Sequence, residues 1–214
     1  MPAAEAVPSM IDPRKPFRFS REGFLLVLSG PSGAGKGTLV DRLIGARAEC
    51  VFSISATTRT RRSNEQEGVQ YEFVTREDFV RRREAGEFLE WAEVHDNLYA
   101  TPLRFVDENI KAGRVVVLDL DVQGGASVRR LRPDAVSVFI LPPSVDALRQ
   151  RLRGRNTDSD AVVELRLQNA PGEIAQYTDY QYLVVNDELD SASQRLTAIV
   201  DAELSRVARL RVDK

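Results

Sequence analysis

Short, continuous apolar runs recur along the chain, each long enough for one strand. They lie at residues 24–29, 115–120, 136–141 and 182–186. Runs of this length are typical of strands buried on both faces of a parallel sheet. Amphipathic stretches with helical spacing follow or separate them, at residues 38–44, 104–112, 145–153, 161–169 and 191–209. The alternation predicts an α/β fold whose parallel sheet is flanked by helices.

Two regions depart from this alternation. Residues 53–104 are polar and aromatic, and residues 71–74 within them alternate like a half-exposed strand, so we interpret them as an inserted lobe. Residues 146–176 are rich in arginine and mostly helical, which favours a mobile lid. Residues 1–20 carry four prolines and are interpreted as a flexible extension. The domain at 21–214 then has its core at residues 21–52, 105–145 and 177–214.

Composition narrows the class of protein. The chain has 214 residues and a net charge of −2, so no basic excess points to nucleic-acid binding. No apolar run reaches the roughly 18 residues of a membrane span, and residues 1–20 lack the pattern of a secretory signal, so we expect a cytoplasmic protein. Cys50 and His95 are the only cysteine and histidine, which disfavours disulfides, soft-metal clusters and histidine-based triads. The oligomeric state stays open, with a homo-oligomer among the alternatives.

The strongest chemical signal is a glycine-rich segment between the first apolar run and the first helical stretch. It matches the phosphate-loop pattern G-x-x-x-x-G-K, in which Lys36 reaches the β and γ phosphates. Glycines let backbone N–H groups point at phosphate oxygens, and the next helix presents its positive end to the same anion. Gly37 stands where serine or threonine is usual. The predicted ATP-binding residues are Gly30, Pro31, Ser32, Gly33, Ala34, Gly35, Lys36, Gly37 and Thr38.

A second motif joins hydroxyl groups to arginines. Residues 53–62 contain serines and threonines that run into Arg59 and Arg62, and Tyr71 follows. Hydroxyl and guanidinium groups are good partners for a phosphate dianion. A solvated polar strand and turn is the alternative interpretation.

Two acidic motifs come next. Residues 87–94 place Glu90 beside aromatic residues, which suits a purine, and the alternative is a helix end with Trp91 in the core. Asp119 and Asp121 lie at the end of an apolar run, where parallel strands face a ligand crevice. They suit hydrated Mg²⁺ or a base, and the alternative is a cap for the next helix.

Arginines gather in the lid region, among them Arg151, Arg155 and Arg166. In a phosphate-loop enzyme such arginines suggest clamps for the charge of a transferring phosphoryl group. A solvated helix is the alternative interpretation.

Together these motifs resemble guanylate kinase in order and spacing, from about residue 24 to about residue 204. They read Gly-Pro-Ser-Gly-x-Gly-Lys, Ser-x-Ser-x-Thr-Thr-Arg-x-x-Arg, Phe-Leu-Glu-Trp and Leu-Asp-x-Asp-x-Gln-Gly. The resemblance implies a three-layer P-loop NTPase fold with a GMP-binding lobe and an Arg-rich lid. It also implies transfer of the γ-phosphoryl group of MgATP to GMP, with Mg²⁺ as the cofactor and ATP and GMP as the partners.

The resemblance also assigns roles to single residues. Those that it places on the GMP phosphate are Ser55, Arg59, Arg62, Tyr71 and Tyr99. Those that it places on guanine are Glu90, Thr101 (near O6) and Asp121. Those that it places around the transferring phosphoryl group are Lys36, Arg59, Arg151, Arg155 and Arg166. Those that it places near Mg²⁺, partly through water, are Thr38 and Asp119.

The guanine assignment has a physical basis of its own. Guanine presents N1–H and its 2-amino group along one edge, and a carboxylate accepts from both. Adenine has an acceptor at N1 and no 2-amino group, so the carboxylate would be left unpaired. A site of this kind can reject the wrong base by roughly 10⁴.

Particular residues disfavour other functions for this chain. An interaction module of the same fold would be expected to have a degraded phosphate loop, whereas Gly35 and Lys36 are present. A kinase for another phosphorylated acceptor should lack the carboxylates of Glu90 and Asp121, and adenylate kinase should lack the Thr-Thr-Arg-x-x-Arg motif. The positions that depart from the family pattern are Asn64, Ala100, Asn156 and Pro171, the last of which is expected to interrupt a helix.

Overall fold

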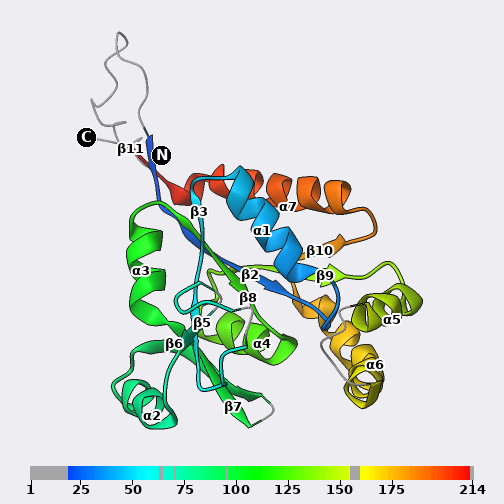
Figure 1. Cartoon of the computed structure of the whole chain (residues 1–214). Helices are drawn as coiled ribbons and strands as arrows, with labels where there is room; N and C mark the ends of the chain where they lie inside the picture. Colours follow the sequence, from blue (N-terminus) through cyan, green and yellow to red (C-terminus); the bar gives the residue numbers. More distant parts are fainter. Residues whose placement is uncertain (1–18, 63–64, 70, 95, 155–159, 213–214) are drawn as a thin grey trace, which may run out of the picture.

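The central element is a five-stranded parallel sheet in the order β10-β9-β2-β8-β3 (Figure 1). The computed structural model describes residues 19–62, 65–69, 71–94, 96–154 and 160–212. The strands of this sheet are β2 (Phe24–Ser29), β3 (Cys50–Phe52), β8 (Val115–Asp119), β9 (Val136–Leu141) and β10 (Tyr182–Val185). The four apolar runs supply four of the strands, so the predicted parallel sheet is confirmed.

Helices cover both faces of this sheet (Figure 1). They are α1 (Lys36–Ala46), α3 (Leu103–Lys111), α4 (Val122–Leu131) and α7 (Leu189–Leu204). Leu26 and Leu28 pack in a core with α1 and α7, whereas Leu25 and Val27 pack in a second core with α3 and α4. Successive side chains of a strand point to opposite faces, which is why both sides of β2 are apolar. The three-layer α/β fold is therefore confirmed.

A second, mixed sheet of four strands has the order β5-β4-β7-β6. Its strands are β4 (Ser55–Thr57), β5 (Tyr71–Phe73), β6 (Phe88–Val94) and β7 (Asn97–Pro102). Helix α2 (Arg76–Glu84) lies between β5 and β6 along the chain. Phe79 of α2 packs in a small core with Leu98 and Ala100. The alternative of a helix end with Trp91 in the core is wrong, because β6 pairs with β7 and Trp91 is 44% exposed.

Two further helices, α5 (Val145–Arg153) and α6 (Asp160–Ile174), pack against each other through an apolar cluster. The expectation that Pro171 interrupts a helix is wrong, because α6 continues through it. Pro171 is exposed near the end of α6, and the missing amide gives up one helical hydrogen bond. Asn64 and Asn156 lie outside the described residues.

The remaining elements are short. They are β1 (Phe19–Arg21), η1 (Ala175–Asp179), η2 (Val207–Arg209) and β11 (Leu210–Val212), with β1 and β11 paired antiparallel. The helix predicted to reach residue 209 therefore ends at Leu204. In the part of the chain that the structure describes, no helix is both long and apolar enough to cross a membrane.

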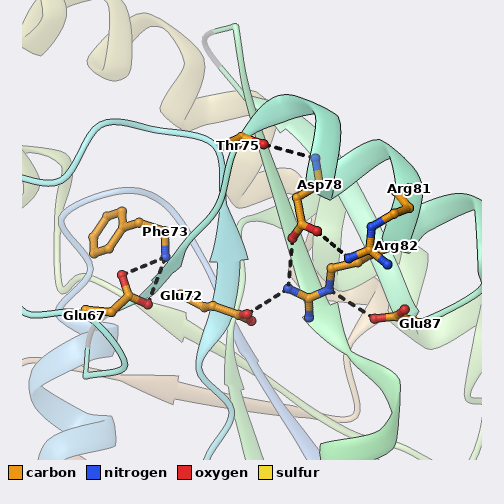
Figure 2. A network of polar contacts seen from close by, with 8 residues as sticks. All are labelled: Glu67, Glu72, Phe73, Thr75, Asp78, Arg81, Arg82 and Glu87. Atoms are coloured by element: carbon orange, nitrogen blue, oxygen red, sulfur yellow. Dashed lines mark hydrogen bonds and ion pairs between the residues drawn. The ribbon is translucent and has the colours of Figure 1, made fainter.

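Arg82 of α2 lies among three carboxylates of the second sheet region (Figure 2). Its Nη1 donates to Oε1 of Glu72 at 2.8 Å, and its Nε donates to Oε2 of Glu87 at 3.1 Å. Oδ2 of Asp78 lies 3.9 Å from the same Nη1. The guanidinium carbon is also 4.9 Å from the centre of the Phe88 ring. Arg82 thus ties α2 to β5 and to the start of β6.

We expect Arg82→Met to lower the free energy of unfolding by about 1–2 kcal/mol, because the carboxylates lose a shared partner. Arg104→Met is the matched control, since Arg104 is 89% exposed and pairs with Glu108 of its own helix. Chemical denaturation followed by circular dichroism measures both. Equal losses for the two variants would contradict the role given to Arg82.

Candidate active site

The glycine-rich segment forms a loop between β2 and α1, at the carboxyl edge of the parallel sheet. Gly30 and Gly35 have φ angles of 141° and 93°, which glycine adopts readily. A Cβ at Gly30 would lie 2.2 Å from the carbonyl oxygen of Ile140, and one at Gly35 would lie 2.3 Å from Nδ2 of Asn186. No side chain caps the start of α1. Uncapped N–H groups at the start of a helix are suited to bind an anion.

Lys36 is held by carbonyl oxygens of this loop and by a carboxylate of the neighbouring strand. Its Nζ donates to the carbonyl oxygen of Gly30 at 2.9 Å and lies 3.8 Å from Oδ1 of Asp119. Asp119 is the last residue of β8, which neighbours β2 in the sheet. Adjacent parallel strands thus bring the lysine of one motif to the carboxylate of another.

Glu90 and Thr101 face each other across β6 and β7, where they are register partners. Oγ1 of Thr101 donates to Oε1 of Glu90 at 2.7 Å, and both residues are buried. Burial raises the pKa of Glu90 to about 7, against the hydrogen bond from Thr101, and the charge of Asp121 raises it further. A buried carboxyl group of this kind marks a candidate ligand site.

Asp121 begins α4, and its Oδ1 accepts from the N–H of Gly124 at 2.7 Å. The alternative interpretation, a helix cap, is therefore confirmed, yet the same side chain also lines a cavity. This cavity of about 200 Å³ is lined by Ser55, Tyr71, Glu90, Ala92, Val94, Tyr99, Asp119, Leu120, Asp121 and Gly124. The structure thus brings together six predicted site residues that are far apart in the sequence.

Glu65 accepts hydrogen bonds from the side chain of Arg59 and from the backbone of Arg62. Nη2 of Arg59 donates to its Oε1 at 2.7 Å, and the backbone N–H of Arg62 donates to its Oε2 at 2.8 Å. The guanidinium carbon of Arg59 lies 5.4 Å from the centre of the Tyr71 ring, which meets the Tyr99 ring edge to face at 5.8 Å. The pKa of Tyr71 is raised, and burial of the side chain is the largest cause. The sequence motif included Glu65 without a role, and its place three residues after Arg62 was the available signal.

Arginines of α5 and α6 contact the phosphate loop as well. Nη1 of Arg151 donates to the carbonyl oxygen of Ala34 in the loop at 3.3 Å, and its Nη2 donates to the carbonyl oxygen of Asn186 at 2.8 Å. Nη1 of Arg166 donates to Oγ of Ser32 at 3.0 Å. Asn186, which the sequence reasoning missed, follows β10 at the same edge of the sheet. The predicted Arg155 lies outside the described residues.

The two predicted metal ligands line different hollows. Thr38 lines one of about 360 Å³ together with Arg151, whereas Asp119 lines the cavity that contains Glu90. Across the described residues, no group of three or more His, Cys, Asp or Glu side chains could hold a metal ion. A divalent ion here would need oxygen ligands from a substrate or water as well.

A larger cavity of about 680 Å³ joins the loop, the lobe and α6. The cationic side chains in its wall are Lys36, Arg59, Arg62 and Arg166. Tyr99 and Asp121 line both this cavity and the smaller one. Four cations around one hollow suit phosphate groups that must approach each other.

A phosphate loop at the edge of a parallel sheet, facing a cationic cavity, places the protein in the class of P-loop kinases. The family model described as guanylate kinase matches residues 22–203. The chain therefore belongs to the guanylate kinase family.

Relatives agree in sequence and in structure. Guanylate kinase from Symbiobacterium thermophilum is 47% identical over 197 residues, which is 92% of this chain and 91% of the relative. Guanylate kinase from a Chelativorans species is 49% identical over 190 residues, 88% of this chain and 87% of the relative. The crystal structure of guanylate kinase from Anaplasma phagocytophilum matches with a TM-score of 0.75 at 34% identity, covering 90% of this chain and 92% of that one.

The raised pKa of Glu90 predicts a pH-dependent stability. The folded pKa of about 7 exceeds the ordinary value of 4.5, so this contribution to stability is complete below pH 4.5 and is lost as the pH rises through 7. Between pH 5.5 and pH 8.5, the free energy of unfolding of Glu90→Gln should therefore rise by about 2 kcal/mol relative to that of the unchanged protein.

Urea unfolding at the two pH values measures this difference. Glu93→Gln is the matched control, because Glu93 lies on the same strand and is 51% exposed. A pH-independent difference between Glu90→Gln and the unchanged protein would show that the carboxyl group is not destabilised by its burial.

Proposed function

We propose that the protein transfers the γ-phosphoryl group of MgATP to GMP, giving ADP and GDP. One observation carries the proposal: the cavity beside the phosphate loop and the cavity that contains Glu90 share Tyr99 and Asp121 in their walls. A donor phosphate on the loop and a base near Glu90 would then face each other through the acceptor phosphate.

Guanine is the base that suits this carboxylate pair. Glu90 and Asp121 would accept from N1–H and the 2-amino group, and adenine would leave them unpaired. Thr101, which the resemblance placed near O6, donates a hydrogen bond from its hydroxyl group to Glu90. We therefore give Thr101 the role of orienting Glu90, with contact to O6 requiring the hydroxyl to turn.

The acceptor phosphate would bind to the polar side chains between the base and the loop. They are Ser55, Arg59, Arg62, Tyr71 and Tyr99. Glu65 holds the guanidinium group of Arg59 and the backbone of Arg62. A phosphate oxygen of GMP is largely ionised near neutral pH, since the second pKa of a phosphate monoester is about 6. The reaction therefore needs no strong general base.

The main barrier is electrostatic, because two anions must approach in line. Two unit charges about 4 Å apart repel by about 4 kcal/mol at an effective dielectric constant of 20. We assign Lys36, Arg59, Arg151, Arg155 and Arg166 to the charge of the transferring group, and the loop at residues 30–38 to the phosphates of ATP. Lys36 and Arg166 both donate hydrogen bonds to the loop.

Mg²⁺ fits the oxygen groups at this edge of the sheet. It is usually held by one or two carboxylates together with substrate phosphates and water. Asp119, next to Lys36, would supply the carboxylate, and Thr38 would supply a hydroxyl on the first turn of α1. When bound, the ion would neutralise part of the phosphate charge.

We further propose that residues 53–104 act as the GMP-binding lobe and residues 146–176 as the lid on the core. Closure of both would exclude water, which otherwise hydrolyses ATP. The cytoplasm, where both nucleotides occur, is the proposed location.

A coupled assay of ADP release tests the proposed reaction with MgATP and each of GMP, AMP, CMP and UMP. We expect turnover with GMP and, for AMP, a kcat/KM lower by roughly 10⁴. Comparable turnover with AMP would overturn the role of the carboxylates. Binding of GMP by folded protein without any turnover would favour an interaction module instead.

The variant Lys36→Ala should fold and lose at least about 10²-fold in kcat, because the transferring charge loses a preorganised cation. Lys111→Ala is the control, since Lys111 is exposed at the end of α3. Circular dichroism verifies folding, and the coupled assay measures kcat. Normal turnover by Lys36→Ala would refute the phosphate-loop role.

A further inference from the structure

Helix α6 places a carboxylate in the wall of the phosphate cavity. Glu173, one residue before the end of α6, lines the cavity of about 680 Å³ together with Gly30, Ser32 and Lys36 of the phosphate loop. A cavity that receives phosphates gains nothing from an additional negative charge, because like charges repel. The proposed reaction gives Glu173 no role, so its position calls for another explanation.

The groups around Glu173 are those that would receive phosphate. Burial raises its pKa most, Lys36 lowers the pKa, and Asp121 raises it. Weaker lowering of the pKa comes from the backbone N–H of Ser32 and from Arg166. Arg166 also donates to the side chain of Ser32 at 3.0 Å. The carboxylate therefore faces a loop N–H group and the loop lysine, as a phosphate oxygen would.

The spacing along α6 explains why Glu173 points to the loop. The cavity-lining residues of α6 are Val162, Leu165, Arg166, Asn169 and Glu173, and each lies three or four residues from another member of the set, which puts them on one helix face. The neighbouring face is fixed, because Val163, Leu167 and Ala170 pack with α5. Packing of α6 on α5 thus turns both Arg166 and Glu173 towards the loop.

We propose that Glu173 competes with the phosphates of ATP for the anion position of the phosphate loop and is displaced when they bind. This inference rests on the proposed function. Glu173 sets the affinity for the nucleotide and disfavours small anions, because a ligand with several phosphate charges competes with the carboxylate better than one with few. Arg166 lies on the same helix face and is attracted to the phosphates, whereas Glu173 is repelled by them. Nucleotide binding therefore acts on α6 through both side chains.

Isothermal titration calorimetry with Mg²⁺ and a non-hydrolysable ATP analogue tests this inference. Glu173→Gln should bind the analogue about tenfold more tightly, because the competing charge is gone. The same variant should bind inorganic pyrophosphate more tightly as well. General damage to the site would weaken binding, so a gain in affinity separates competition from a merely structural role.

Three further variants complete the test. Glu173→Ala also removes the charge and should bind the analogue more tightly, whereas Glu173→Asp keeps the charge and should stay close to the unchanged protein. Glu164→Gln is the matched control, because Glu164 lies on the same helix, is 53% exposed and pairs with Arg153. Its affinity should not change.

An unchanged affinity in both charge-removing variants would overturn the inference, and a weaker one would show that Glu173 holds the nucleotide instead. In either case, binding of the analogue by the unchanged protein leaves the proposed function standing. No binding by the unchanged protein would contradict the proposed function together with the inference.

Discussion

The structure depends on concentrating positive charge in one cavity without letting the cations repel one another or collapse the site. Three of the four cations that line this cavity donate to acceptors within the protein. Lys36 donates to the carbonyl oxygen of Gly30, Arg59 to the carboxylate of Glu65, and Arg166 to the hydroxyl oxygen of Ser32. These cations come from the start of α1, the inserted lobe and α6, so the fold has to hold three separate regions around one hollow. Preorganisation of this kind is the main means by which a protein stabilises a phosphoryl transfer.

The parallel sheet could be predicted because its strands are buried on both faces and therefore read as unbroken apolar runs. Other elements leave weaker signals. Helix α2 buries Phe79, and apart from Phe79 and Val80 all its residues are charged, so it has almost no apolar periodicity. Helix α4 contains Gly124 and Gly125, which lower its helix propensity, and the cap by Asp121 was its main local signal. Strand β6 is defined by its pairing with β7, which a local pattern does not reveal.

The same division holds for the site. Residues in compact motifs, such as Lys36 and Glu90, could be named from the sequence because their chemistry is local. Residues that reach the loop from distant elements could not. Asn186 donates to the carbonyl oxygen of Ala34 at 2.8 Å across 152 positions, which only the order of strands in the sheet explains. Glu173 reaches the loop because α6 packs on α5, and that packing follows from tertiary structure rather than from any motif.

The central claim is that both nucleotides bind to one continuous, cationic site. A single molecule that joins adenosine to guanosine through five phosphates tests it most directly, since it spans both sites only if their phosphates meet. The account predicts that one such molecule per chain competes with both ATP and GMP and binds far more tightly than either, because the second contact becomes intramolecular. Competition with only one nucleotide, or a requirement for two molecules per chain, would contradict a shared cavity.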